Sequence, residues 1–179
     1  MTDMLIRSVV TPLDIAGDGR TVIGMVAPYG RPILVDDGFG AYTEEIDRGA
    51  FDRITQRSEP RHVKLVLEHH GAWVGRGDRW LDSRDGLSIA FRLDDSEPGR
   101  VAAFKLRDGQ VPGLSVGMVP GRTRTVVGPG GPVEHRITIK ALPHVALVPE
   151  GAYPEAVVSA VRHRSTDRLS AVQQWLDSQ

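Results

Sequence analysis

The chain has 179 residues, a length typical of a single domain. Its 22 lysines and arginines nearly balance its 23 aspartates and glutamates, so the formal net charge is −1. Dedicated nucleic-acid-binding proteins normally carry a basic excess, and we therefore expect no direct nucleic-acid contact. The absence of cysteine excludes a disulfide framework, a thiol nucleophile and a Cys-based zinc site. No apolar run approaches the roughly 20 residues that span a bilayer, so we expect a soluble intracellular protein without membrane contact.

The first third of the chain predicts a strand, a loop and a short helix. The β-branched run at residues 21–27 is typical of a strand, and Pro28 and Gly30 close it. Residues 32–42 predict a surface loop. Residues 44–56 predict a chain that enters a short helix, with three buried apolar side chains: Ile46, Phe51 and Ile54.

The middle of the chain predicts three strands. Residues 63–69 form an apolar run that ends in histidine, and residues 79–82 and 86–93 follow as two further strands. The turn between the last two contains Asp85-Gly86, which favours a hairpin because this pair tolerates positive φ.

A helix and two long strands are predicted next. Ser96 is positioned to cap a helix over residues 96–106, which Asp108-Gly109 ends. Residues 114–127 and 133–148 then predict two long strands around a glycine-rich hairpin tip. That tip lacks the Gly-Lys-Ser/Thr ending of a phosphate-binding loop.

The end of the chain predicts two more helices, at residues 154–161 and 165–179. In the second, apolar residues recur at helical spacing beside a tryptophan: Leu169, Val172, Trp175 and Leu176. The whole pattern is β-rich with a few peripheral helices. It favours an α+β fold with a closed or barrel-like antiparallel sheet over a parallel α/β fold.

Two histidines and a serine are the candidates for chemistry. His69 ends an apolar strand, His144 lies inside the apolar run Leu142–Val148, and Ser115 lies between glycines in Gly113-Leu-Ser-Val-Gly117. Taken singly, each residue is also compatible with a structural role. The His69-His70 pair leaves open a metal-dependent hydrolase, although no His-Glu-x-x-His pattern and no carboxylate-rich ligand set accompany it. The Gly-x-Ser-x-Gly letters do not indicate an α/β-hydrolase elbow, because the sequence after Ser115 continues as a strand.

Several segments taken in order are more informative than any one of them. They are an apolar strand with glycine, a Glu-x-Ile-x-x-Gly-Ala-Phe-like element, a strand ending in histidine, a Gly-x-Ser-x-Gly motif and a closing apolar run: residues 23–29, 44–51, 63–69, 113–118 and 142–148, the last followed by Ala152–Ala156. In this order and spacing they resemble the prohead (capsid maturation) proteases of tailed bacteriophages, which are relatives of the herpesvirus assemblins.

The resemblance implies an assemblin-like fold and a serine-protease mechanism of acyl transfer. Ser115 falls on the nucleophile and His69 on the general base. The third position is His144, where many phage members have Glu, so the arrangement is similar to the Ser-His-His set of the herpesvirus enzymes. An Arg-containing loop supplies an oxyanion donor in those enzymes, which makes Arg122 and Arg124 the candidates here. No metal and no organic cofactor are implied.

The resemblance also implies a substrate and a setting. The expected activity is endoproteolysis of scaffold protein, or of delta-type segments of the major capsid protein, with self-cleavage possible and a homodimer or larger assembly. The expected location is the host cytoplasm, inside assembling proheads. We expect residues 1–162 to form the protease domain and residues 163–179 an amphipathic tail for assembly or docking. The alternative is a non-catalytic assembly or scaffolding module with the same fold.

Overall fold

The protein is described by a computed structural model that covers five stretches of the chain: residues 5–9, 14–15, 19–36, 41–68 and 71–149. The helices predicted at 154–161 and 165–179, the division of the chain after residue 162, and His69 all lie outside the described residues. They stay predictions. In the part of the chain that the structure describes, no helix is long and apolar enough to cross a membrane.

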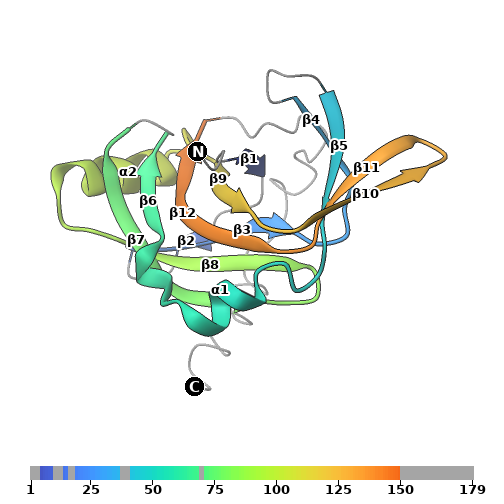
Figure 1. Ribbon diagram of the computed structural model, residues 1–179. Helices are drawn as coiled ribbons and strands as arrows, with labels where there is room; N and C mark the ends of the chain where they lie inside the picture. The colour runs from blue at the N-terminus through green and yellow to red at the C-terminus, as the bar shows by residue number, and fades with distance from the viewer. Residues whose placement is uncertain (1–4, 10–13, 16–18, 37–40, 69–70, 150–179) are drawn as a thin grey trace.

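An eight-stranded sheet forms the body of the molecule (Figure 1). It curls so that β3, near one edge, packs against β9 and β1 at the other. Neighbouring strands are antiparallel except for β12 and β6, which run parallel. This barrel-like, β-rich architecture confirms the predicted fold class. The order across the sheet is β1 (Leu5–Val9), β9 (Gly113–Pro120), β12 (Ile139–Val148), β6 (Lys64–Leu67), β7 (Trp73–Asp82), β8 (Gly86–Leu93), β3 (Thr21–Pro28) and β2 (Asp14–Ile15).

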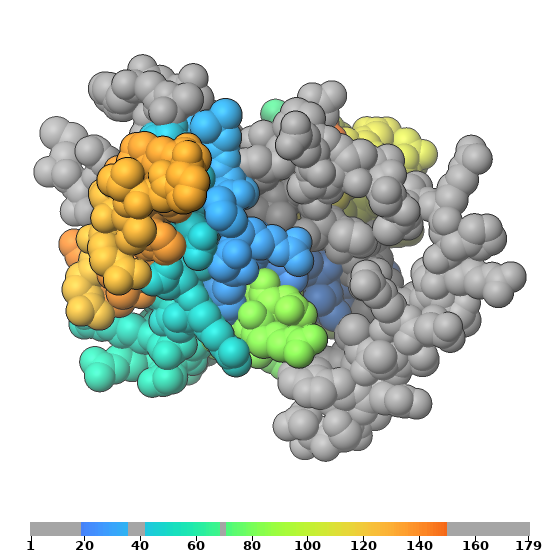
Figure 2. Space-filling model, turned by 90° about the vertical axis from the view of Figure 1, so that its right-hand side faces the viewer, coloured from blue at the N-terminus to red at the C-terminus, as the bar shows by residue number. Residues whose placement is uncertain are grey.

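A second, four-stranded sheet projects from one side of the body (Figure 1). Its order is β10 (Thr123–Gly128), β11 (Gly131–Arg136), β5 (Ala41–Ile46) and β4 (Ile33–Asp36), with β11 and β5 parallel. Figure 2 shows the β10–β11 hairpin, in yellow to orange, lying along the cyan chain of β5.

The two long strands predicted at 114–127 and 133–148 are each broken in two. Residues 113–120 and 139–148 belong to the large sheet, whereas 123–128 and 131–136 belong to the small one. Backbone hydrogen bonds between the two breaks fix this corner: Gly121 N–H donates to Thr138 O at 2.7 Å, and Ile137 N–H to Arg122 O at 3.0 Å. The prediction was wrong here because the strand-like composition runs on through the corner.

The predicted loop at residues 32–42 was also wrong in part. Residues Ile33–Asp36 form β4, which pairs antiparallel with β5 from Ala41 onward. Val35 is buried, whereas Leu34 is 70% exposed, so the strand covers little core and gives only a weak signal in the sequence.

The helices and the central hairpin follow the prediction. Helix α1 (Asp52–Arg57) comes directly after β5, and the side chains of Ile46, Phe51 and Ile54 are buried as expected. Helix α2 (Glu97–Arg107) starts at Ser96, whose side chain accepts a hydrogen bond from Gly99 N–H at 3.2 Å. In the hairpin between β7 and β8, Ser83 N–H donates to Gly86 O at 3.1 Å. A short 3-10 helix, η1 (Pro60–His62), leads into β6.

The apolar core lies inside the curl of the large sheet. Phe91, Leu87 and Ile89 of β8 and Leu65 of β6 are completely buried there, and Phe51 seals the side next to α1. The body is thus a filled barrel. Its surface and edges are where functional groups can meet a substrate.

Candidate active site

Ser115 lies on β9, a strand that is buried on both faces. Leu114, Val116 and Met118 point into the apolar core. Because side chains alternate along a strand, Ser115 and Gly117 lie on the opposite face. The chain continues as a strand to Pro120, which confirms that the Gly-x-Ser-x-Gly letters do not form a strand-to-helix elbow.

His144 lies beside that face, on the neighbouring strand β12. In the antiparallel register Ala146 is opposite Ser115, and His144 is opposite Gly117. The imidazole lies against Gly117: a Cβ atom placed on that glycine would be 2.4 Å from Cε1 of the ring and 2.8 Å from Nε2. The structure therefore brings Ser115 and His144 to the same face of adjacent strands. The pair Ser115–Ala146 and the pair Gly117–His144 are two positions apart along the strands, so they are neighbours on that face. Diagonal neighbours of this kind are within reach of a long side chain.

Gly117 has a specific role in this arrangement. The glycines around Ser115 suggest close backbone approach in general, whereas the structure shows that Gly117 leaves room for the His144 ring. Any other residue at position 117 would displace the imidazole or the strand. The glycine at position 117 is visible in the sequence, but the His144 ring that occupies the space beside it belongs to a residue 27 positions further along the chain.

The strand that leads to His69 runs on the other side of β12. Val66 is paired with Ala146 and Leu67 with Leu147, in parallel register. Glu68 N–H then donates to Leu147 O at 2.9 Å, and Glu68 has a φ of 56°, in the left-handed region. Val66 therefore lies across Ala146 from Ser115, β6 ends one residue later at Leu67, and the backbone turns at Glu68. Residue 69, the predicted base, is outside the described residues, so its position relative to Ser115 stays a prediction.

The Arg122–Arg124 region lies at the other end of β9. Ser115 is near the start of that strand, and Arg122 follows its last residue, Pro120. At about 3.3 Å per residue, the strand from Ser115 to Pro120 alone spans roughly 15–20 Å. An oxyanion donor must lie about 3 Å from the reacting oxygen, so we do not retain Arg122 or Arg124 for this role.

Ser115 has no solvent-exposed surface, whereas His144 is half-buried. A substrate carbonyl has to come within about 3–3.5 Å of a nucleophile.

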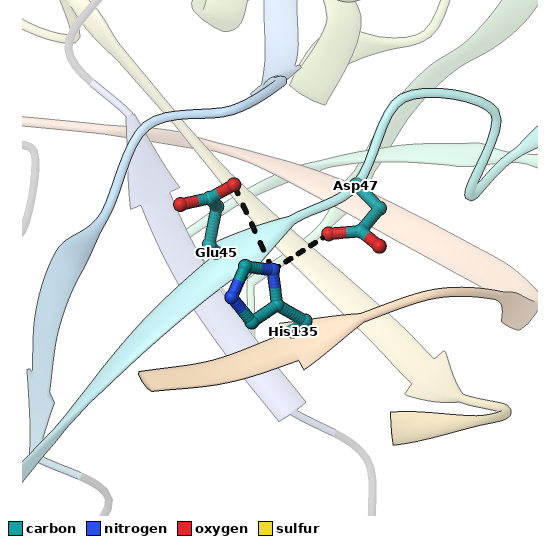
Figure 3. Close-up of side chains that lie close together, drawn as sticks. All are labelled: Glu45, Asp47 and His135. Atoms are coloured by element: carbon teal, nitrogen blue, oxygen red, sulfur yellow. Dashed lines mark hydrogen bonds and ion pairs between the residues drawn. The ribbon is translucent and has the colours of Figure 1, made fainter. Parts of the chain in front are cut away.

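A second cluster of polar side chains lies in the small sheet, away from Ser115. His135 of β11 and Glu45 of β5 are register partners, and Asp47 follows on the same side (Figure 3). His135 Nδ1 lies 2.9 Å from an oxygen of Asp47 and 3.7 Å from an oxygen of Glu45. These are metal-ligand types, and their ligand atoms lie within 4.8 Å of one another. A hydrogen bond between His135 and Asp47 accounts for the shorter contact, and we assign no metal to the cluster.

The opposite face of the small sheet holds a buried ion pair that the sequence did not indicate. Glu44 has no exposed surface and accepts a hydrogen bond from Arg136 Nε. The remaining nitrogens of Arg136 donate to Thr123 Oγ1 at 3.0 Å and Tyr42 OH at 3.2 Å, and contact Glu134 at 3.0 Å. Every end of the guanidinium has a partner, so this pair is structural.

A polar hollow near the β7–β8 hairpin contains two carboxylates, Asp52 and Asp82, and a tyrosine that is not available as a general base. Tyr29 lines it and donates its hydroxyl to Asp82 at 3.0 Å. Burial, together with the nearby Asp82 carboxylate, raises the pKa of Tyr29 well above its usual value. The hydroxyl therefore stays protonated at physiological pH.

Comparison with known proteins points to one family. A family model described as caudovirus prohead serine protease matches residues 15–171. Among solved structures, the chain is similar to the capsid assembly protease gp21 of bacteriophage T4, with a TM-score of 0.55 and 10% identity. The match covers 80% of this chain and 97% of that one. At this identity the likeness shows a shared fold. No curated protein matches the chain.

Proposed function

The chain belongs to the caudovirus prohead serine protease family, and we propose that it is an endopeptidase that cleaves scaffold protein or delta-type segments of the capsid protein during prohead maturation. The expected setting is the assembling prohead in the host cytoplasm. There the protein would act as a homodimer or larger assembly and could also cleave itself. The capsid assembly protease of bacteriophage T4 supports this setting through its similar fold.

One observation carries the proposal for the site. Ser115 and His144 share one face of two adjacent strands, and Gly117 makes room for the histidine ring between them. The strand on the other side of β12, β6, ends two residues before the predicted base His69. Nucleophilic catalysis requires a base within hydrogen-bond reach of the serine and a third group that orients the base, and this placement of Ser115, His144 and the end of β6 supports that proposal.

The proposed mechanism is acyl transfer. The Ser115 hydroxyl attacks the scissile carbonyl while His69 takes its proton, and the tetrahedral oxyanion forms. His69 then gives the proton to the leaving amine, and water hydrolyses the acyl-enzyme by the same steps. His144 orients His69. A neutral imidazole offers that ring a hydrogen bond only, whereas the Glu of many phage members would add a full charge.

The test is cleavage of the natural substrate. The full chain is coexpressed with the capsid and scaffold proteins of its own phage, and the products are identified by intact mass. Ser115→Ala should lower the cleavage rate by a factor on the order of 10⁴–10⁶ and leave the fold intact, since it removes only an oxygen. Ser88→Ala, at another strand serine on β8, is the matched control and should cleave like the wild type.

Three outcomes separate the alternatives. Cleavage that survives a chelator and is lost in Ser115→Ala supports the serine mechanism. Cleavage that a chelator abolishes would indicate the metal-dependent hydrolase instead. If the wild type is incorporated into proheads and cleaves nothing, the protein is a non-catalytic assembly module.

A further inference from the structure

Three adjoining hollows form a groove between helix α1 and the first half of β12. Lys140 lines all three, Arg53 lines two of them, and Ile54 and Ser58 also line two. The groove begins at the corner near Arg122 and ends near Pro143, the residue before His144. We call it the α1 groove.

Four cations line the α1 groove: Arg53, Arg57, Arg122 and Lys140. All four side chains are exposed, and none forms a salt bridge with any residue that the structure describes. The one carboxylate in the lining is Glu59, which is paired with Arg61 outside the groove. In a chain of net charge −1, this concentration of unpaired positive charge creates a local field that attracts an anionic partner.

The floor at one end of the groove is apolar. Ile54, Val63 and Leu142 are buried there, next to the half-buried Trp80. The Trp80 indole N–H already donates to Ser58 O at 2.9 Å, so the ring presents its apolar surface. A partner that combines acidic and apolar side chains fits this lining better than a uniform polyanion, whose phosphates would leave the apolar floor uncovered.

We propose that the α1 groove is a docking site for an extended, acidic segment of a protein partner. The inference deepens the proposed function, on which it rests for the identity of the partner: the segment would belong to the substrate. Carboxylates would pair with the groove cations, and apolar side chains would cover Leu142 and Trp80.

The groove lies apart from the scissile bond. Lys140 is six residues before Ala146, the residue opposite Ser115, which corresponds to at most about 20 Å along β12. A segment bound at Lys140 therefore lies some six residues from the bond that is cut. It would strengthen substrate binding without contacting the reacting atoms, so the groove should affect KM and leave kcat unchanged.

The binding test uses the Ser115→Ala protein, so that the peptide stays intact whether or not the chain is a protease. The probe is a fluorescent 15-residue peptide of alternating Glu and Leu. The Arg53→Glu/Lys140→Glu double variant should bind it at least tenfold more weakly, because two attractions become repulsions. Lys105→Glu/Arg107→Glu, which makes the same charge change on α2, is the matched control and should stay within about twofold. Circular dichroism checks that each variant is folded.

Equal affinity of the double variant and the parent protein would overturn the proposal. So would a single-stranded oligonucleotide of equal charge that binds as tightly as the peptide and shows the same loss, since the groove would then be a nucleic-acid site.

A kinetic measurement links the groove to the proposed function. In the active enzyme, the double variant should raise KM about tenfold for a substrate that carries an acidic segment. It should leave kcat, and the cleavage of a short neutral peptide, unchanged. A fall in kcat on the short peptide would overturn the docking role. If the wild type cleaves nothing but the peptide binding behaves as expected, the proposed function fails and the docking site stands.

Discussion

Two pairs of strands, one in each sheet, bury polar groups for different reasons. In the large sheet, β9 and β12 hold Ser115 and His144 among apolar neighbours. In the small sheet, β11 and β5 bury Glu44 against Arg136. Burial of a polar or charged group costs free energy unless partners compensate for the lost water. Glu44 and Arg136 compensate for each other, and their role ends there.

The serine–histidine pair is different because both side chains belong to the proposed catalytic site. Leu114, Val116 and Met118 of the same strand fill the core, whereas Ser115 lies on the opposite face, next to His144 on β12. The buried pair of the small sheet therefore serves stability, whereas the pair of the large sheet is proposed to serve catalysis. This difference predicts that substitutions in the two regions should separate activity from stability.

The largest effect on the cleavage rate is expected from substitution of the two histidines of the proposed site. His69→Ala should lower the cleavage rate by a factor on the order of 10⁴ or more, and His144→Ala should cost one to two orders of magnitude less, because a poorly oriented base still accepts a proton. His144→Glu should retain activity, since it restores a charged orienting group. Single-turnover cleavage of the capsid substrate measures all three. If His144→Ala cleaves like the wild type, His144 is structural and the site is a dyad.

The strand position of Ser115, the capped helix and the β7–β8 hairpin could be predicted because local signals determine them. Ser96 caps its own helix, and Asp85-Gly86 makes its own turn. The break of the two long strands could not be predicted, because the bonds that fix it join Gly121 and Arg122 to residues some 16 positions away.

The ion pair of the small sheet could not be predicted either, because its two residues are far apart in the sequence. Glu44 belongs to the Glu-x-Ile-like element, and its partner Arg136 lies 92 positions further along the chain. A charged residue in an isolated sequence segment favours the surface, so its burial shows only once the strands are paired. The closeness of His144 to Gly117 has the same origin, since it depends on the register of β9 and β12.

A large effect on stability is expected from the buried ion pair of the small sheet. Glu44→Gln leaves the Arg136 guanidinium buried with less compensation and should lower the free energy of unfolding by up to about 3–5 kcal/mol. Glu134→Gln is the matched control: this glutamate also contacts Arg136 but is 38% exposed, so its loss should cost about 1 kcal/mol or less. Urea unfolding measures both. Equal costs would show that Glu44 is not the main counter-charge, and cleavage per folded molecule should be unchanged in either variant.

A smaller effect on activity is expected at Gly117. A methyl group there would overlap the His144 ring, and Gly117→Ala should lower cleavage about 10–100-fold, because displacement of a catalytic group by 1 Å can cost that much. Gly130→Ala, at the hairpin tip of the small sheet, has nothing within 4 Å of the added atom and serves as the control. An active Gly117→Ala enzyme would mean that the ring position is not critical.

The smallest effect is expected at an ion pair on the surface. Arg20 contacts Asp95, and its hydrogen bond and positive charge lower the pKa of that carboxyl below the usual value. Because the folded-state pKa is lowered, any stabilisation is present above the usual pKa of aspartate and is lost as the pH falls through the lowered one. Asp95 is 79% exposed, however, and water and salt screen the pair. Asp95→Asn should therefore leave the thermal midpoint at pH 7 unchanged within error, whereas Glu44→Gln lowers it clearly. A fall in Asp95→Asn as large as that in Glu44→Gln would contradict the argument that burial decides what an ion pair contributes.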